Sequence, residues 1–274
     1  MRFGIVTDEL SQEPREAIDT ALDWGIRDFE LRHVRAERFP RFATLDVLDE
    51  LAALHEEYAI RYTAVSPGFF KCHIENAAEV HYALGEGLER AMDFMEGCEI
   101  PTLICFGFER AGADDADVVE HLQQLADRLD ARRLQAAVEN ETHCTFDTPA
   151  RIAHMLRLVN RANMGANWDY ANLKQYAPDG FPEGYELVKP HMLNVHVKDV
   201  ALLPDGSTLW KPVGEGICDW AGQMRALERD GVVEHVVIES HCGPPEEVGL
   251  HNLETLRRYI EDTAAEDEFR GRQR

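Results

Sequence analysis

Hydrophobic and polar residues alternate in short segments that are spread along the whole chain. In NVHVKD, residues 194–199, Val195 and Val197 alternate with polar residues. Alternation with a period of two is typical of a β-strand whose two faces meet different surroundings. From this pattern and from short apolar runs we predict eight strands, at residues 3–7, 27–31, 60–65, 101–106, 134–139, 164–169, 192–197 and 235–239.

The segments between these strands carry apolar residues every three or four positions, which predicts amphipathic helices. Pro14 in a first turn and Gly25 at an end mark the bounds of the first helix, and Thr148 before Pro149 marks the start of a later one. Gly85 and Gly87 lie inside the third predicted helix and disfavour a helical conformation in its middle. We predict helices at 14–25, 44–58, 76–97, 114–133, 148–161, 219–231 and 251–266, with a weak helical signal at 183–189.

Strands that alternate with helices, without a break in composition, predict one α/β domain with a parallel sheet. The chain has 274 residues, and a closed (β/α)₈ TIM barrel of about 250 residues fits this length better than a doubly wound open sheet. No G-x-G-x-x-G sequence follows the first strand, which disfavours a dinucleotide-binding open sheet. We therefore expect a single TIM-barrel domain over residues 1–265 and a charged, frayed tail over 266–274.

The charge of the chain is strongly negative, with 28 Lys and Arg against 51 Asp and Glu and a net charge of −23. Such a surface repels phosphate backbones, so we expect no nucleic-acid partner. We also expect no membrane partner and a cytoplasmic location, because no apolar run approaches about 18 residues and no secretory signal opens the sequence. The six cysteines form no C-x-x-C pair, which is typical of reduced thiols.

The last four predicted strands each place an ionisable residue at or near their carboxyl end. Counting alternate positions puts His196 on the same face as Asn194, opposite Val195 and Val197. The same count puts Asp169 with Asn167, Glu139 with Gln135 and Glu239 with His235. In a barrel that face points inward, and polar residues at the carboxyl ends of barrel strands are typical of active sites. The four are Glu139, Asp169, His196 and Glu239, separated by 30, 27 and 43 residues.

Three carboxylates and one imidazole at one end of a barrel need partners, because buried like charges repel and an unpaired buried carboxylate is costly. One divalent cation would satisfy all four, and ligands of mainly oxygen with one nitrogen suit Mn²⁺, Mg²⁺, Co²⁺ or Zn²⁺. The alternative is that each acid forms a salt bridge or faces solvent. We expect one divalent metal ion as the cofactor.

Several sequence pieces resemble those of the xylose isomerase-like TIM-barrel superfamily, which groups sugar isomerases and epimerases with inosose dehydratase, 3-dehydroshikimate dehydratase and endonuclease IV. The resemblance implies that Glu139, Asp169, His196 and Glu239 bind one divalent metal. It also implies that Glu139 and Glu239 face the substrate from opposite sides. The matching pieces, in order along essentially the whole chain, are VEN (138–140), NWDYAN (167–172), VHVKD (195–199), GEG with a following DW (214–220) and VIES (237–240).

These residues predict a metal-dependent isomerase or epimerase of a small sugar or keto-polyol. Glu139 and Glu239 would act as the acid/base pair, removing and returning an α-proton through a metal-stabilised enediolate. If a β-hydroxyl leaves instead, the enzyme is a lyase that dehydrates an inosose-like or dehydroshikimate-like substrate. An endonuclease IV-like DNA repair enzyme and a non-catalytic sugar-binding barrel are more distant alternatives.

The partner is expected to be a sugar or keto-polyol, and because barrels of this group often dimerise, the resemblance implies a homodimer. Three departures from the ketose 3-epimerase pattern argue against that particular activity. Position 172 is Asn rather than His, position 145 is Thr rather than Glu, and no arginine lies between Asp199 and Arg225. Candidates for contact with the substrate are Lys198, His143, Asn172, Arg32, Glu30 and Lys71.

Overall fold

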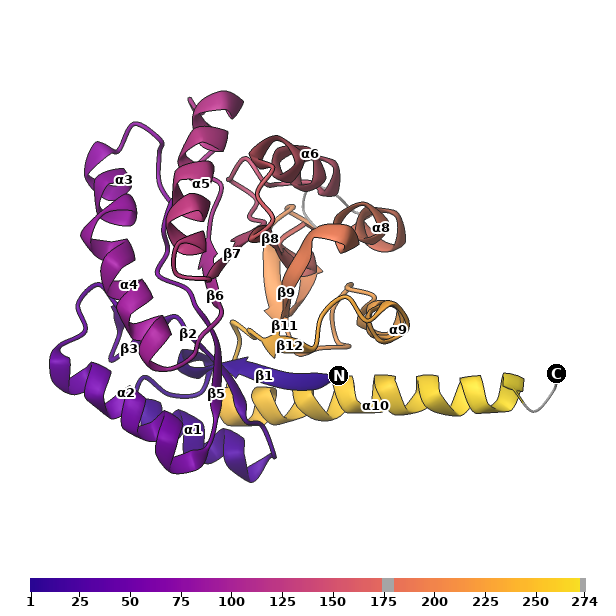
Figure 1. Cartoon of the computed structure of the whole chain (residues 1–274). Coiled ribbons are helices and arrows are strands. Elements are labelled where there is room, and N and C mark those ends of the chain that lie inside the picture. The colour runs from indigo at the N-terminus through magenta and orange to yellow at the C-terminus, as the bar shows by residue number, and fades with distance from the viewer. Residues whose placement is uncertain (174–179, 272–274) are drawn as a thin grey trace.

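A computed structural model describes residues 1–173 and 180–271, with side chains described as far as residue 262. Eight parallel strands close into a barrel in the order β1-β12-β9-β8-β7-β6-β5-β2, and helices surround it (Figure 1). The predicted TIM barrel is therefore confirmed, and each predicted strand lies within two residues of an observed one. The strands are β1 (Arg2–Val6), β2 (Asp28–Leu31), β5 (Arg61–Val65), β6 (Thr102–Cys105), β7 (Gln135–Glu139), β8 (Met164–Asp169), β9 (Met192–Val197) and β12 (His235–Ile238).

The helices follow the predicted pattern, apart from the short α7 (Tyr170–Leu173), which was not predicted, and two further differences. The predicted helix at 76–97 is wrong as a single element, because Gly85 leaves the helical conformation (φ −115°, ψ −119°) and divides it into α3 and α4. The last helix begins at Pro245, six residues before the predicted start. The helices are α1 (Pro14–Asp23), α2 (Leu45–Tyr58), α3 (Ala77–Leu84), α4 (Glu86–Gly97), α5 (Asp115–Asp130), α6 (Pro149–Val159), α7 (Tyr170–Leu173), α8 (Tyr185–Val188), α9 (Trp220–Asp230) and α10 (Pro245–Gly271).

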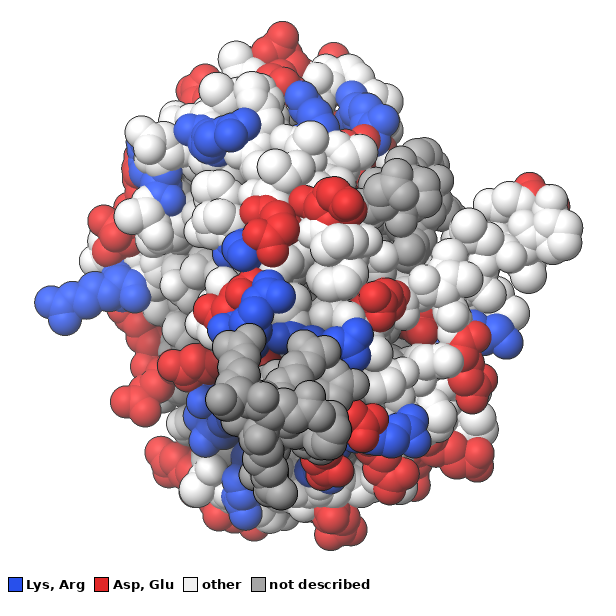
Figure 2. Space-filling view, turned by 90° about the vertical axis from the view of Figure 1, so that its right-hand side faces the viewer, with Lys and Arg blue, Asp and Glu red and all other residues white. Residues whose placement is uncertain are grey.

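The end of α10 extends beyond the barrel (Figure 1). The backbone of the predicted tail is helical as far as Gly271, and fraying there stays a prediction. In the described part of the chain, no helix combines the length and the apolar character that a membrane span requires. On the face drawn in Figure 2, basic side chains are interspersed among acidic ones, in keeping with the excess of Asp and Glu.

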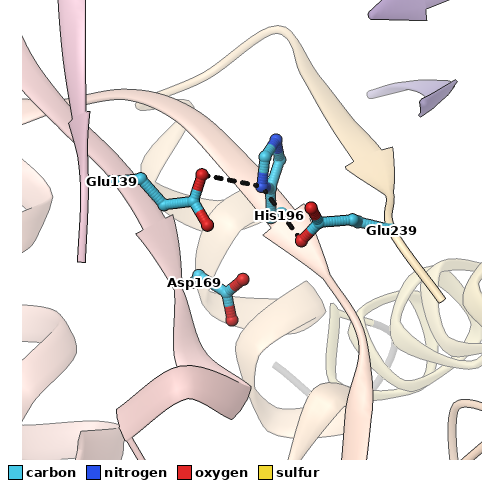
Figure 3. A group of neighbouring side chains, drawn as sticks. All are labelled: Glu139, Asp169, His196 and Glu239. Atoms are coloured by element: carbon cyan, nitrogen blue, oxygen red, sulfur yellow. Dashed lines mark ion pairs between the residues drawn. The ribbon is translucent and has the colours of Figure 1, made fainter. Parts of the chain in front are cut away.

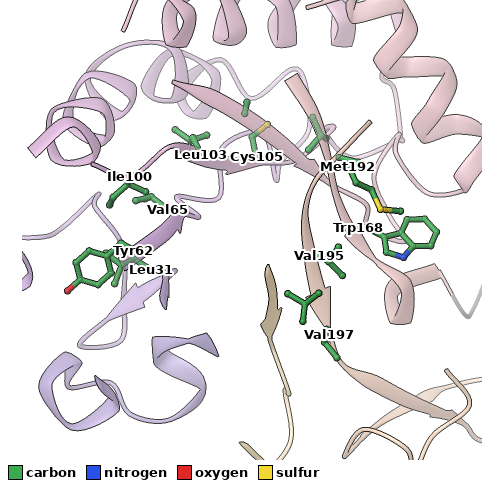
Figure 4. Close-up of a cluster of buried hydrophobic side chains, with 14 of the residues drawn as sticks. Leu31, Tyr62, Val65, Ile100, Leu103, Cys105, Trp168, Met192, Val195 and Val197 are labelled. Atoms are coloured by element: carbon green, nitrogen blue, oxygen red, sulfur yellow. The ribbon is translucent and has the colours of Figure 1, made fainter. Parts of the chain in front are cut away.

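The main hydrophobic core lies between the barrel and its helices. Outward-facing side chains of the strands, such as Val195 and Val197 of β9 and Trp168 of β8, are fully buried there (Figure 4). The barrel interior has a separate small apolar cluster of Ala64, Ile104 and Ala137. Toward the carboxyl ends of the late strands the inward positions are mainly polar, as the alternation in the sequence predicted, and they include Asn167, Asp169, Asn194 and His196.

Two hairpins follow barrel strands and lie outside the eight-stranded barrel. One is the pair β3 (His33–Val34) and β4 (Glu37–Arg38), directly after β2. The other is β10 (Asp199–Leu202) paired with β11 (Thr208–Lys211), directly after β9. Both hairpins bring side chains to the carboxyl ends of the strands.

Candidate metal centre and cavity

The four residues predicted at the strand ends lie together at the carboxyl end of the barrel. Glu139 and Asp169 end β7 and β8, His196 lies near the end of β9, and Glu239 directly follows β12. The parallel register places Asp169 beside His196, and His196 beside Val237, two residues before Glu239. Each residue offers one ligand atom, and these atoms all lie within 4.8 Å of one another. All four side chains are buried, so the donor set and its geometry fit one divalent cation.

The acids of this cluster occupy different sides of the histidine. Figure 3 shows the carboxyl groups of Glu139 and Glu239 on opposite sides of the His196 ring. Nδ1 of His196 lies 3.7 Å from Oε2 of Glu139 and 3.3 Å from Oε2 of Glu239. A small molecule bound at this centre would therefore meet a carboxyl group from either side.

Burial and mutual repulsion set the charge states of the acids. Burial and the nearby charge of Glu239 raise the pKa of Glu139 to about 7. Burial also raises the pKa of Asp169, although Lys198 opposes the shift. For Glu239 the balance is reversed, because Lys198, His196 and His241 outweigh the cost of burial and hold its pKa well below the usual value. The carboxylates are thus crowded, and part of their charge lacks compensation.

Lys198 places a positive charge among the carboxylates of the cluster. Its side chain is buried, and Nζ lies 2.6 Å from both Oδ2 of Asp169 and Oε2 of Glu239. These carboxylates keep the pKa of Lys198 above its usual value in spite of burial. The ammonium also lies 5.1 Å from the centre of the Trp210 ring, which belongs to the β10–β11 hairpin. Lys198 therefore bridges two of the carboxylates and faces the cavity.

Glu30 of β2 orients the histidine from behind. Oε2 of Glu30 lies 2.8 Å from Nε2 of His196, so that Nδ1 turns toward the acids. Burial lowers the pKa of His196, but Glu30, Glu239 and Glu139 more than compensate and raise it well above its usual value. A carboxylate on the second nitrogen is the usual support of a metal-binding histidine. The side chain of Glu30 is fully buried beneath His196 and does not line the cavity, and its contact with the substrate stays a prediction.

Hydrogen bonds join the sequence pieces that carried the family resemblance. Asn140 of VEN accepts from the backbone N–H of Asp169 and donates to its carbonyl oxygen. Asp199 of VHVKD accepts from the backbone N–H groups of Gly214 and Gly216 in the GEG piece. Trp220 of the following DW donates its indole N–H to the carbonyl oxygen of Lys198. These bonds fix the strand ends and the loop around the cluster relative to one another.

A cavity of about 470 Å³ opens beside the cluster. Four of the predicted substrate contacts line it, namely Lys198, Asn172, Arg32 and Lys71. His143 is exposed and does not line this cavity, and its contact with the substrate stays a prediction. The full lining among described residues is Asp8, Arg32, His33, Arg38, Ser66, Lys71, Phe106, Glu139, Glu141, Asn172, Lys198, Trp210, Glu239 and His241.

Arg32 connects the first strands to the cluster. Its guanidinium lies 2.5 Å from Glu239, 2.8 Å from Asp8 and 2.7 Å from Glu9. Asp8, although buried, has a pKa of about 2 because His33 and Arg32 stabilise its charged form. Arg32 is therefore held by carboxylates at the cavity wall.

Sequence reasoning missed several residues of the cavity. Asp8 lies two residues after the end of β1, in the short helical turn there, so the rule that polar residues gather at strand ends could have found it. Glu141 and His241 lie two residues after the strand-end residues Glu139 and Glu239, so the same rule could have found them. Arg38 and Trp210 reach the cavity from the two hairpins, and no periodic pattern in the sequence indicates that they do.

The chain belongs to the xylose isomerase-like TIM barrel family, whose model matches residues 18–259. A search of curated proteins finds no significant match. Solved structures with the same fold include a probable 3-DHS dehydratase, AsbF, from Bacillus anthracis, at 14% identity and a TM-score of 0.78. That match covers 94% of this chain and 99% of the other.

Two further structures extend the comparison. An L-ribulose 3-epimerase has 13% identity and a TM-score of 0.77, with 98% of this chain and 97% of the other covered. The IOLI protein, solved with a bound zinc atom, has 16% identity and a TM-score of 0.77, with coverage of 97% and 99%. At these identities the likeness shows the fold, and the buried Glu–Asp–His–Glu cluster is this chain's own evidence for a metal site.

Proposed function

We propose that this protein is a metal-dependent isomerase or epimerase of a small sugar or keto-polyol. The observation that carries the proposal is the buried cluster at the cavity, with Glu139 and Glu239 on opposite sides of His196. Two carboxyl groups placed across a substrate can remove a proton from one face and return it to the other face or to the neighbouring carbon. The names of the related structures, an L-ribulose 3-epimerase among them, support the same class of reaction.

Glu139, Asp169, His196 and Glu239 would hold the cation, with Glu30 fixing the ring of His196. A bound divalent ion would polarise a substrate carbonyl and stabilise the negative charge that develops on its oxygen. Asn172 donates to Glu139 at 3.4 Å and to the carbonyl oxygen of Asn140, and so orients that glutamate. Lys198 would place positive charge beside the reacting oxygen atoms, since its ammonium is buried among the same carboxylates.

A dehydratase is the second candidate, and a specific observation favours it. Asn172 and Thr145 occupy the positions at which ketose 3-epimerases carry His and Glu. Two residues typical of that activity are therefore replaced in this chain. The probable 3-DHS dehydratase from Bacillus anthracis shares the fold. In this reaction the same proton abstraction is followed by loss of a β-hydroxyl group.

The test is incubation of the metal-loaded protein with a panel of ketoses and keto-polyols in D₂O. An isomerase or epimerase incorporates solvent deuterium at the carbon next to the carbonyl, which NMR detects, whereas a dehydratase produces a conjugated carbonyl that absorbs in the ultraviolet. Glu139→Gln should lower either signal by about 10²-fold or more. Glu234→Gln, at the opposite end of the barrel, is the control. Exchange that survives in Glu139→Gln would contradict the assignment.

A further inference from the structure

One cation of the cavity has no hydrogen-bond or ion-pair partner among the residues that the structure describes. Arg32, Lys71 and Lys198 each form ion pairs with carboxylates of the site. Arg38 also lines the cavity, yet its guanidinium makes no hydrogen bond or ion pair with any described residue of the chain. A partly buried guanidinium without a counterion is unfavourable, because it loses water and gains no fixed acceptor in return.

The fold holds Arg38 in this position. Arg38 ends β4 and pairs with His33 of β3, so the hairpin fixes its backbone at the cavity. Its guanidinium packs directly on Gly68, in the loop after β5. A Cβ atom at Gly68 would lie 2.7 Å from Nε and 2.9 Å from Nη2 of Arg38. Gly68 has φ +77°, a conformation that favours glycine. The loop therefore leaves room for the guanidinium where any side chain would displace it.

The electrostatic surroundings distinguish the two arginines of the cavity. Arg32 has a raised pKa because Glu239, Asp8 and Glu9 outweigh its burial. Burial and the charge of Arg32 instead lower the pKa of Arg38, and nearby acids compensate only in part. Asp8 and Glu239, two of these acids, are already bound to Arg32. The charge of Arg38 is therefore available to a ligand.

We propose that the substrate carries an anionic group, a carboxylate or a phosphate, and that Arg38 binds it. This inference rests on the proposed function, because it adds a second contact to the substrate that meets Glu139 and Glu239. A guanidinium presents a planar fork of donors that matches either anion with two parallel hydrogen bonds. The cavity of about 470 Å³ lies in the range that holds a small ligand with such a group.

Calorimetric titration of the metal-loaded protein tests the proposal with matched probes. The probes are fructose, fructuronate and fructose 6-phosphate, and the corresponding set built on tagatose, so that only the group at the sixth carbon differs. We expect at least one anionic probe to bind 10-fold or more tightly than its neutral parent. Whether the carboxylate or the phosphate is preferred identifies the source of the charge.

Arg38→Gln should remove this preference, with the affinity for the neutral sugar changed less than threefold and the metal content unchanged. Arg35→Gln is the matched control, because Arg35 lies in the same hairpin and pairs with Glu13 and Glu50 outside the cavity. It should keep the preference. Arg38→Lys, which retains the charge but not the fork, should keep part of it.

Equal affinity for neutral and anionic probes in the wild type, absence of binding by every probe, or a preference that survives in Arg38→Gln would each overturn the inference. Equal loss in Arg35→Gln and Arg38→Gln would overturn it too. Failure of the proposed function is a separate outcome, namely a protein that binds no divalent ion or exchanges no deuterium. In that case the anion preference and its loss in Arg38→Gln can be measured by the same titration without added metal.

Discussion

The two ends of the barrel hold cavities of nearly equal volume in which the charged side chains are arranged differently. The cavity at the carboxyl ends of the strands measures about 470 Å³ and contains the crowded acids of the candidate metal centre. The cavity at the amino ends measures about 460 Å³ and is lined by residues such as Arg2, Arg61 and Gln135. Its two arginines are paired, because Arg2 and Arg61 both contact Asp28. Volume alone does not identify the functional end.

Strand β2 contains the same contrast within three residues. Asp28 and Glu30 are both fully buried and point to the same face of the strand. Asp28 neutralises two arginines at the amino end, which is a structural role. Glu30 contacts His196, whose other ring nitrogen faces two more carboxylates. A buried carboxylate thus indicates function where its surroundings add negative charge, and stability where they neutralise it.

The largest expected difference between the ends concerns metal affinity. Asp169→Asn removes one of three carboxylates from the cluster, so we expect it to weaken binding of Mn²⁺ or Zn²⁺ by about 10²-fold or more. Glu234→Gln, at the amino end, should leave the affinity unchanged. Titration with a competing chelator measures both. Similar affinities in the two variants would show that the cluster is not the metal site.

Glu30→Gln should have the next largest effect. It keeps the shape of the side chain but removes the charge that orients His196, and loss of such a support typically lowers metal affinity about 10–100-fold. The same titration reports the change. If Glu30→Gln binds metal as tightly as the wild type, the contact between Glu30 and His196 has no part in the site.

Asp28→Asn should lower the stability of the protein without changing its metal affinity. Two half-exposed arginines lose their buried partner, so we expect a loss of about 1–3 kcal/mol in the free energy of unfolding with no change in metal affinity. Denaturant unfolding monitored by circular dichroism provides the value. A loss of metal affinity in Asp28→Asn would mean that Asp28 also supports the metal site, which would contradict its assignment to a purely structural role.

The smallest expected effect concerns the stability of the metal-free protein and arises from the charge of Glu139. Glu139 has a pKa of about 7 against a usual 4.5, so the folded state binds more protons than the unfolded state between these values. Stability should therefore fall as the pH rises from about 4.5 to about 7.

Above this window, Glu139→Gln should stabilise the chelator-treated protein, by on the order of 1–2 kcal/mol. Glu234→Gln is again the control. Thermal unfolding of the wild type and of both variants at pH 5 and pH 8 shows whether Glu139→Gln is stabilised at the higher pH. A lower stability of Glu139→Gln at pH 8 would mean that the acids of the cluster do not repel one another.

The sequence predicted the barrel and the four clustered residues because both depend on regular strands. In a strand, the position of a residue determines the face to which it points, so the alternation alone places Glu139, Asp169, His196 and Glu239 on the inward face. Gly85 and Gly87 disfavoured the middle of this helix in the sequence, but the division into two helices was not predicted, because an amphipathic pattern that contains glycines is still compatible with one continuous helix.

The cavity wall was less predictable, because much of it comes from loops and hairpins. Arg38 and Trp210 lie in short hairpins, where no period links sequence to direction. Glu30 was placed on the correct face, but its depth was not evident from the strand pattern. His143 follows a strand end that supplies a cluster residue, yet the chain turns its side chain to solvent.

The most direct test of the account is an anomalous diffraction map from crystals grown with Mn²⁺. The account predicts one strong peak at the carboxyl end of the barrel, within bonding distance of Glu139, Asp169, His196 and Glu239. A map without a peak there, or with its peak in the cavity that Arg2 and Arg61 line, would contradict the assignment of the functional end.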